Sequence, residues 1–166
     1  MAHMVETMAY AGQVPWHGLG TKVPNDLTPI QMLEKAGLDW TVEKTDLYYG
    51  DGKVVPGKKG LIRSDGKYLD TIGDDWNPLQ NQEAAEFFND FVAEGDMEMN
   101  TAGSLEDGRR MWMLAKIKDG FTLFGKDEIE QYLLFSNPHK YGLTITVQST
   151  PIRVVCNNTI AMALGR

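Results

Sequence analysis

The hydrophobic positions change their period near the end of the chain. Residues 151–156 suit a strand, with Ile152, Val154 and Cys156 on one face and Arg153 and Val155 on the other, whereas the apolar residues from 158 onward recur at helical spacing. Asn157 and Asn158 stand at the change, where a side-chain oxygen can accept a hydrogen bond from the first N–H groups of a helix. We therefore predict a strand, a cap at Asn158 with Asn157 ordering the turn, and a final helix.

Two earlier stretches also have the spacing of helices. Thr28 is a typical N-cap, Pro29 suits the first helical position, Gln31 completes a capping box and Gly37 stops the helix. An apolar stripe over 82–93 predicts a second helix. We expect this stripe to pack on the core rather than to bind a partner.

The rest of the pattern predicts strands joined by tight turns. Asp-Gly pairs occur at 51–52, 65–66 and 107–108, where they favour β-hairpins and hence an antiparallel sheet. The predicted strands cover 40–49, 53–55, 60–64, 67–72, 98–104, 109–118, 131–136, 143–149 and 151–156, with a short turn or helix near 126–130. This order predicts an α+β fold with a mainly antiparallel twisted sheet and about three helices, ending in a β-β-α unit.

Composition narrows the class of protein. The chain has 166 residues, 42% hydrophobic and 23% charged, which is typical of a globular domain. The net charge of -7 argues against a protein coated in positive charge, but it leaves room for a local basic face. No apolar stretch approaches the roughly 20 residues of a membrane helix, and a lone cysteine suits a reducing compartment. We therefore expect a cytoplasmic protein with no membrane contact.

The two ends of the chain are unusual. The opening letters MAHM are typical of a cloning remnant, so we set residues 1–3 apart and interpret 4–166 as a single domain. The final helix stops about two turns after it begins, which predicts a domain truncated at its C-terminus.

The most distinctive irregular stretch is VPWHGLGTKVP, which contains Trp16, His17, Gly18 and Gly20. Its glycines have neither the spacing of a phosphate loop nor that of a dinucleotide fingerprint. We interpret it as a structural segment that Trp16 pins against the core.

Enzymatic and metal-dependent chemistry have little support. Cys156 at a helix start could act as a nucleophile with His17 or His139 as base, but it lies on an apolar strand face, where an inert buried thiol is expected. No histidine or carboxylate spacing fits a metal site, so we expect no metal and no cofactor.

Basic and aromatic residues alternate along the strand predicted over 109–118. Arg110, Trp112 and Lys116 share one face, Arg109 lies on the other, and Arg153 extends the first face from a neighbouring strand. Such a face could hold a single nucleic-acid strand, because cations meet phosphates and a ring stacks on bases. The alternative is a solvated sheet face with Trp112 half buried.

The chain also resembles a known family. TPIRVVCNNTIAMAL is similar to the hallmark of the phage/plasmid-like protein family, and further matches are VPWHGLGTKV, AGLDWTVE, NPLQNQEAAEFF and TAGSLEDGRRMWMLAKI. The chain departs from the family at Asn137–Lys140, where an Asn-Ser-His-Asp-Gly-like turn is usual. The resemblance implies a domain of unknown function carried by bacteriophages and plasmids, in a bacterial host, whose members continue past this C-terminus.

A second resemblance bears on activity. The closing order of strands and helix looks like the β-β-β-α core of single-strand annealing proteins, which implies an oligomer that holds one DNA strand in a basic groove. Our first hypothesis is a non-enzymatic DNA-metabolism protein that binds single-stranded DNA through Arg109, Arg110, Trp112, Lys116 and Arg153 and promotes annealing in recombination. The alternatives are an interaction module for a host or phage protein and, third, an enzyme that uses Cys156 and His17.

Overall fold

The computed structural model describes residues 4–118 and 130–165, which form an α+β fold as predicted. Within these residues there are nine strands, three α-helices and one 3-10 helix. In chain order they are β1 (Val5–Ala11), β2 (Thr21–Val23), α1 (Pro29–Lys35), β3 (Val42–Tyr49), β4 (Lys53–Arg63), β5 (Tyr68–Gly73), α2 (Asn81–Ala93), β6 (Met97–Leu105), η1 (Glu106–Gly108), β7 (Arg110–Ile117), β8 (Tyr132–Pro138), β9 (Thr146–Thr150) and α3 (Asn157–Ala163).

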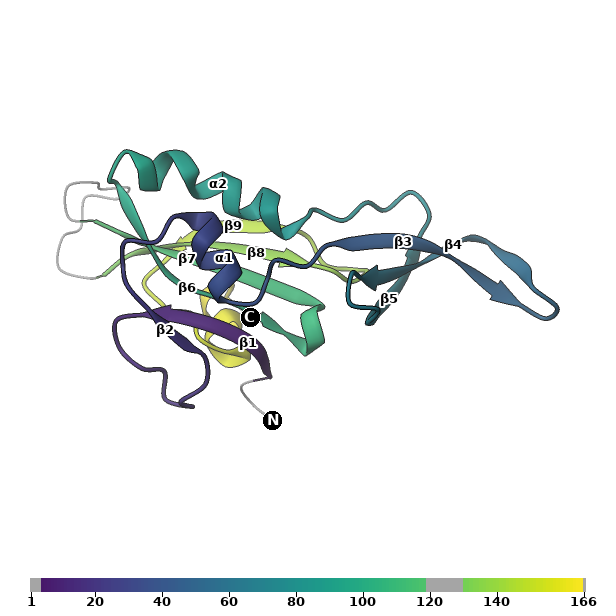
Figure 1. The fold of residues 1–166 in the computed structure, drawn as a ribbon, viewed down its shortest axis with the longest axis horizontal. Helices are drawn as coiled ribbons and strands as arrows, with labels where there is room; N and C mark the ends of the chain where they lie inside the picture. The colour runs from purple at the N-terminus through teal and green to yellow at the C-terminus, as the bar shows by residue number, and fades with distance from the viewer. Residues whose placement is uncertain (1–3, 119–129, 166) are drawn as a thin grey trace.

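The strands form two sheets. The larger has the order β2-β1-β6-β7-β8-β9 and the smaller the order β3-β4-β5. Every pair is antiparallel except β1 with β2, which is parallel. The three Asp-Gly hairpins are confirmed at the β3–β4, β4–β5 and β6–β7 connections. Beyond the end of β5, β3 and β4 continue as a two-stranded arm that projects from the body (Figure 1).

The six-stranded sheet is covered on both faces. Helices α1 and α2 lie on one face, and α3 lies on the other (Figure 1). Alternate residues of β7 point to the two sides: Met111, Met113 and Ala115 belong to the core under α1 and α2, whereas Trp112 and Leu114 pack with α3. The central strand is therefore buried on both faces, which requires apolar residues at consecutive positions.

The start and end of α1 follow the predicted local rules. Thr28 Oγ1 accepts a hydrogen bond from Gln31 N at 3.2 Å, and Gln31 Oε1 accepts one from Thr28 N at 2.9 Å. This reciprocal pair is a capping box, and Pro29 occupies the first turn. After the helix, Gly37 has a φ of +72°, which glycine adopts with little strain.

Several predicted boundaries are wrong. Residues 53–55 and 60–64 belong to one strand, β4, and 151–156 is an irregular segment rather than a strand. The short strands β1 and β2 were not predicted. Of the turn predicted near 126–130, residues 126–129 lie outside the described residues, as do 1–3.

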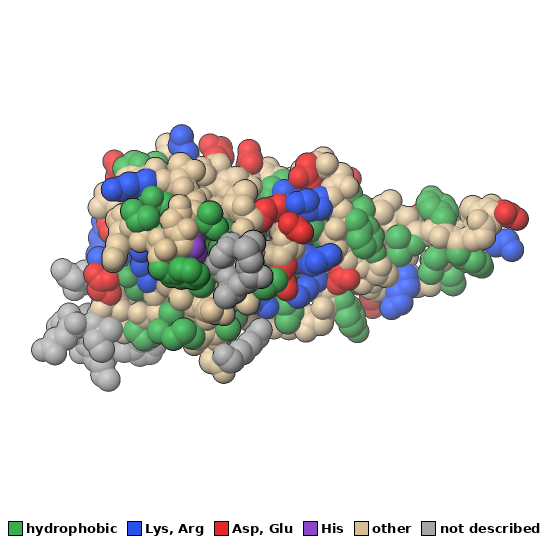
Figure 2. All heavy atoms as spheres, turned by 90° about the horizontal axis from the view of Figure 1, so that it is seen from below, with side chains coloured by type: hydrophobic (Ala, Val, Ile, Leu, Met, Phe, Trp, Pro, Cys, Tyr) green, Lys and Arg blue, Asp and Glu red, His purple; other side chains and the backbone are tan. Residues whose placement is uncertain are grey.

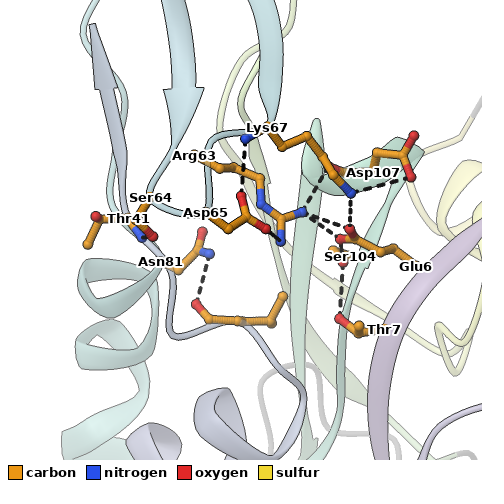
Figure 3. A network of polar contacts seen from close by, with 11 residues as sticks. Glu6, Thr7, Thr41, Arg63, Ser64, Asp65, Lys67, Asn81, Ser104 and Asp107 are labelled. Atoms are coloured by element: carbon orange, nitrogen blue, oxygen red, sulfur yellow. Dashed lines mark hydrogen bonds and ion pairs between the residues drawn. The ribbon is translucent and has the colours of Figure 1, made fainter.

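A partly buried ionic network joins the smaller sheet to the larger one (Figure 3). Arg63 at the end of β4 donates from Nη1 to both carboxylate oxygens of Glu6 on β1, each at 2.8 Å, and to the carbonyl of Asp107 at 2.9 Å. Lys67 Nζ and Ser104 Oγ also bind Glu6, at 2.7 and 2.8 Å. Burial would raise the pKa of Glu6, but these three hydrogen-bond donors outweigh it and lower that pKa. The base of the arm is thus fixed to the body through an ionised carboxylate.

Candidate nucleic-acid interface

The sheet face predicted to bind a nucleic-acid strand is not open. Trp112 has 0% of its surface exposed, and its Nε1 donates to Thr101 Oγ1 at 3.0 Å. Residues 154–156 and α3 cover this side of β7. The prediction of an open or half-buried Trp112 is therefore wrong, because a segment about 40 residues further along the chain packs over it.

The structure does not bring the predicted cations together. Arg110 and Lys116 lie at opposite ends of β7, where Arg110 pairs in register with Leu105 and Lys116 with Glu98. Lys116 forms an ion pair with Glu130 at 3.0 Å. Arg109 is exposed just before β7 and donates from Nε to the carbonyl of Leu69 at 2.7 Å. These three cations do not form a basic face with Trp112.

Arg153 has a different place. Its Nε donates to Asn100 Oδ1 at 2.8 Å, its Nη1 to the carbonyl of Gln13 at 2.9 Å and its Nη2 to the carbonyl of Ala11 at 2.7 Å. Arg153 thus ties the loop after β1 to the irregular segment before α3, across about 140 residues of sequence. Charge-assisted hydrogen bonds of this kind are stronger than neutral ones, so the loop is firmly held.

His17 makes a second tie between the same two segments. Its Nε2 lies 2.9 Å from the carbonyl of Val155, and Leu19 N donates to its Nδ1 at 3.0 Å. A carbonyl can only accept and a backbone N–H can only donate, so the ring is neutral with its proton on Nε2. The two most distinctive sequence motifs therefore lie against each other: residues 14–24 and 150–164.

Trp16 is presented to solvent between these ties. It is 69% exposed, and its ring meets that of His17 edge-on with centroids 5.3 Å apart. The prediction that Trp16 pins the loop to the core is wrong, since His17 and Arg153 do so. Anchoring by its neighbour leaves the indole of Trp16 displayed on a fixed backbone.

The loop glycines serve this geometry. Gly18 has a φ of +69°, and its N–H donates to the carbonyl of Pro15 at 2.9 Å, which closes a tight turn around Trp16 and His17. Gly20 has a φ of +98°, and a Cβ atom there would lie 2.6 Å from Met8 Cγ. Both positions therefore favour glycine, Gly20 for close approach as well as for conformation.

The start of α3 is built differently from the prediction. The N-cap is Cys156, with Thr159 at the third helical position. Thr159 Oγ1 accepts hydrogen bonds from Val155 N at 2.9 Å and Cys156 N at 3.0 Å. Asn157 and Asn158 occupy the first two helical positions, so Asn158 is not the cap, and its side chain is exposed.

The thiol of Cys156 is buried, as the apolar strand face predicts. Its Sγ lies 3.5 Å from Thr159 Oγ1. Both ring nitrogens of His17 are engaged by backbone groups, and His139 Nε2 is bound to Asn81 Oδ1 at 2.8 Å. The structure therefore pairs neither histidine with the thiol.

The two segments that meet beside Trp16 differ in composition from the chain as a whole. Residues 7–25 and 131–166 contain no Asp or Glu, although the net charge of the chain is -7. Lys22 on β2 pairs in register with Tyr10, whose ring packs on the α3 side, so Lys22 projects to the side on which Arg153 and α3 lie. Exposed Lys22, exposed Asn158 and the partly exposed Arg153 accompany Trp16 on these acid-free segments. Below, the Trp16 face means Trp16, Lys22, Arg153 and Asn158.

Residues 4–118 and 130–165 contain no group of three or more His, Cys, Asp or Glu that could hold a metal ion. Over the same residues, no helix has the length and apolar character needed to cross a membrane.

The model of one uncharacterised family, described as a domain of unknown function (DUF932), matches residues 68–166. The chain belongs to this family. No match was found among curated proteins or among solved structures. The DUF932 region contains Arg153 and α3, whereas the loop with Trp16 and His17 precedes it. The Trp16 face therefore joins the matched region to a segment outside it.

Sequence reasoning selected Trp16, His17 and Arg153 but did not connect them. Asn158 was selected as a helix cap rather than as part of a surface, and Lys22 was missed. One signal could have found the face: the last 36 residues contain no acidic side chain in an acidic protein.

Proposed function

We propose that this DUF932 protein binds a single strand of nucleic acid on the Trp16 face, without enzymatic chemistry. The observation that carries the proposal is a 69% exposed tryptophan held on a fixed loop between acid-free segments of an acidic chain. Exposed aromatic rings stack on bases of any sequence, and nearby cations neutralise phosphates. In keeping with its resemblance to phage and plasmid proteins, we propose that the strand is DNA and that binding promotes annealing in recombination.

Each residue of the Trp16 face has a chemical role in this proposal. Trp16 stacks on one base. Lys22 contributes a point charge to a phosphate, and Arg153 contributes the N–H groups that its three structural hydrogen bonds leave over, since a guanidinium has five donors. The exposed Asn158 amide can donate to a base edge or a phosphate. None of these contacts is specific for sequence.

Fluorescence anisotropy with labelled oligo-dT and a duplex of equal length tests the proposal at several salt concentrations. Trp16→Ala should weaken oligo-dT binding by about 1–3 kcal/mol with little change in its salt dependence. Lys22→Gln should instead flatten the slope of log K against log salt by about 0.7, the value of one single-strand phosphate contact. The contrast separates stacking from charge on one surface.

Two matched variants serve as controls. Tyr141→Ala removes a ring of nearly equal exposure, 66%, and Lys58→Gln removes an exposed lysine on the arm. Both should bind oligo-dT as the unchanged protein does. If Trp16→Ala and Tyr141→Ala have equal affinity, or if low salt reveals no binding of oligo-dT at all, the proposal fails.

A protein partner is the second candidate, favoured by the exposed apolar neighbours of Trp16. Val14 and Leu19 on the same loop are 52% and 39% exposed. A rigid tryptophan with aliphatic neighbours is typical of an anchor at a protein interface. Under this alternative the unchanged protein binds a host or phage protein but does not bind oligo-dT. Trp16→Ala then abolishes binding of that partner protein.

A further inference from the structure

The arm carries an unusual set of exposed side chains. Tyr48, Tyr49 and Val54 are 64%, 53% and 49% exposed, and Lys53 and Lys58 are exposed beside them. Within the described part of the chain no ion pair involves either lysine, whereas Lys59, which lies opposite Ile72 of β5, pairs with Asp46. Figure 2 shows the arm standing clear of the body with hydrophobic and charged side chains along it.

The register shows how these side chains are arranged. Tyr48 lies opposite Val54, and Tyr49 lies opposite Lys53. Directly opposed residues of antiparallel strands share a face, so each face of the arm near its tip carries one tyrosine. Large apolar groups gathered on an exposed surface are typical of an interaction site.

The exposed face of α2 has the complementary character. Glu83, Glu86, Asp90 and Glu94 are exposed along it, and α2 contains no Lys or Arg. At their centre Phe87 is 37% exposed, and its ring contacts Phe135 with centroids 5.3 Å apart. Val147, which lies opposite Phe135 on β9, is 43% exposed, so an apolar strip borders the acidic stripe.

The arm cannot reach α2 of its own molecule. Arg63 and Lys67 fix its base to Glu6 on β1, and from that base the arm extends away from the body on which α2 lies (Figures 1 and 3). The two surfaces can therefore meet only between molecules.

From this complementarity we propose that the arm of one molecule docks on the α2 face of a second copy. Tyr49 meets Phe87 and Val147, while Lys53, which lies opposite Tyr49 on the same face of the arm, and Lys58 face the α2 carboxylates. The two surfaces differ and lie on different parts of the molecule, so the contact is heterologous and each docked copy leaves a further arm and a further α2 face unused. This proposal is independent of strand binding on the Trp16 face.

Sedimentation velocity of the full chain over a range of concentrations tests the proposal. We expect concentration-dependent association that weakens when salt rises from about 50 to about 500 mM, because the Debye length falls several-fold. The double variants K53E/K58E on the arm and E86K/D90K on α2 should each stay monomeric at concentrations where the unchanged protein associates. A one-to-one mixture of the two should form heterodimers, since one supplies an unchanged α2 face and the other an unchanged arm.

The control is D26K/E34K, which makes the same change in charge as E86K/D90K at exposed positions outside the arm and α2. It should associate as the unchanged protein does, and Trp16→Ala should too. Equal melting temperatures of all variants exclude a folding defect. The proposal is overturned if the unchanged protein is monomeric at every concentration, if K53E/K58E still associates, or if the mixture does not recombine. Loss of oligo-dT binding in K53E/K58E without any change in association also overturns it.

Discussion

Trp112 and Trp16 exchange the roles that their sequence surroundings predict. Trp112 lies between Arg110 and Lys116 on an alternating strand, yet it is fully buried. Trp16 lies in a loop rich in glycine and proline, yet it is 69% exposed. Both stand next to the same covering segment: residues 154–156 pack over Trp112, and the carbonyl of Val155 holds His17.

The difference teaches what alternation can and cannot establish. It indicates which residues of a strand share a face, and that part of the prediction for β7 is confirmed by the two core clusters. It says nothing of whether another segment covers the face. That depends on packing between parts of the chain far apart in sequence, which no local period records.

Replacing the two tryptophans by alanine is the most direct test of this contrast. Trp112→Ala should lower the free energy of unfolding by about 3–5 kcal/mol, since it leaves a cavity and removes the hydrogen bond that Thr101 Oγ1 accepts. Trp16→Ala should change it by no more than about 0.5 kcal/mol, as surface substitutions usually do. Urea unfolding followed by circular dichroism measures both, and equal losses would contradict the exchange of roles.

Acid should lower the stability of the fold through His139, which is buried. Burial, assisted by the charge of Arg63, lowers the pKa of His139 to about 4. Its Nε2 donates to Asn81 Oδ1, so a second proton on Nδ1 would be buried without a partner.

The unfolded chain binds this proton near pH 6.5 and the folded chain only near pH 4. The contribution of neutral His139 to the free energy of unfolding is therefore complete above pH 6.5 and is lost as pH falls toward 4. At about 1.4 kcal/mol per pKa unit, the loss amounts to about 3 kcal/mol. Urea unfolding between pH 7 and pH 4 should show this slope, and His139→Gln should flatten it. An unchanged slope in that variant would assign the acid sensitivity elsewhere.

Arg153→Ala should release the loop after β1, which contains Trp16 and His17, from its fixed position. The variant loses three hydrogen bonds, including those to the carbonyls of Ala11 and Gln13. Its free energy of unfolding should be lower by about 2 kcal/mol. Amide hydrogen exchange of residues 11–20 should speed up, while exchange in β7 follows only the global loss. Arg109→Ala, which removes a side-chain hydrogen bond to the carbonyl of Leu69, is the matched control and should leave the loop protected.

The smallest expected effect concerns the start of α3. Thr159→Val removes the oxygen that accepts from Val155 and Cys156 N–H groups, and should cost about 1 kcal/mol. Asn158→Ala should cost almost nothing, because its side chain is exposed at the second helical position. Thermal melting compares the two, and a larger loss from Asn158→Ala would restore asparagine as the cap.

The features that could be predicted from sequence are those with local causes. Thr28, Pro29 and Gln31 define the start of α1 within four residues, and each Asp-Gly pair defines a hairpin without help from other segments. The cap of α3 was misplaced by two residues because Asn158 and Cys156 both stand near the change in period.

Only part of the candidate site could be predicted from the sequence, for a related reason. Trp16, His17 and Arg153 carry distinctive chemistry and could be selected, but the carbonyls that Arg153 binds are present in any sequence. Because every residue has a backbone carbonyl, no sequence pattern identifies Ala11 and Gln13 as acceptors. Only the fold brings them within reach of a side chain about 140 residues away.

The ties from Arg153 and His17 also bear on the order in which the protein acquires structure. They join residues 138 to 142 positions apart, so the entropy of closing a loop of that length must be overcome before either forms. On the ribosome, the loop with Trp16 emerges early but has nothing to hold it until the segment around residue 155 has left the exit tunnel. We expect a nascent chain shorter than this to expose a loose tryptophan, so that the Trp16 face forms only after the segment around residue 155 has emerged.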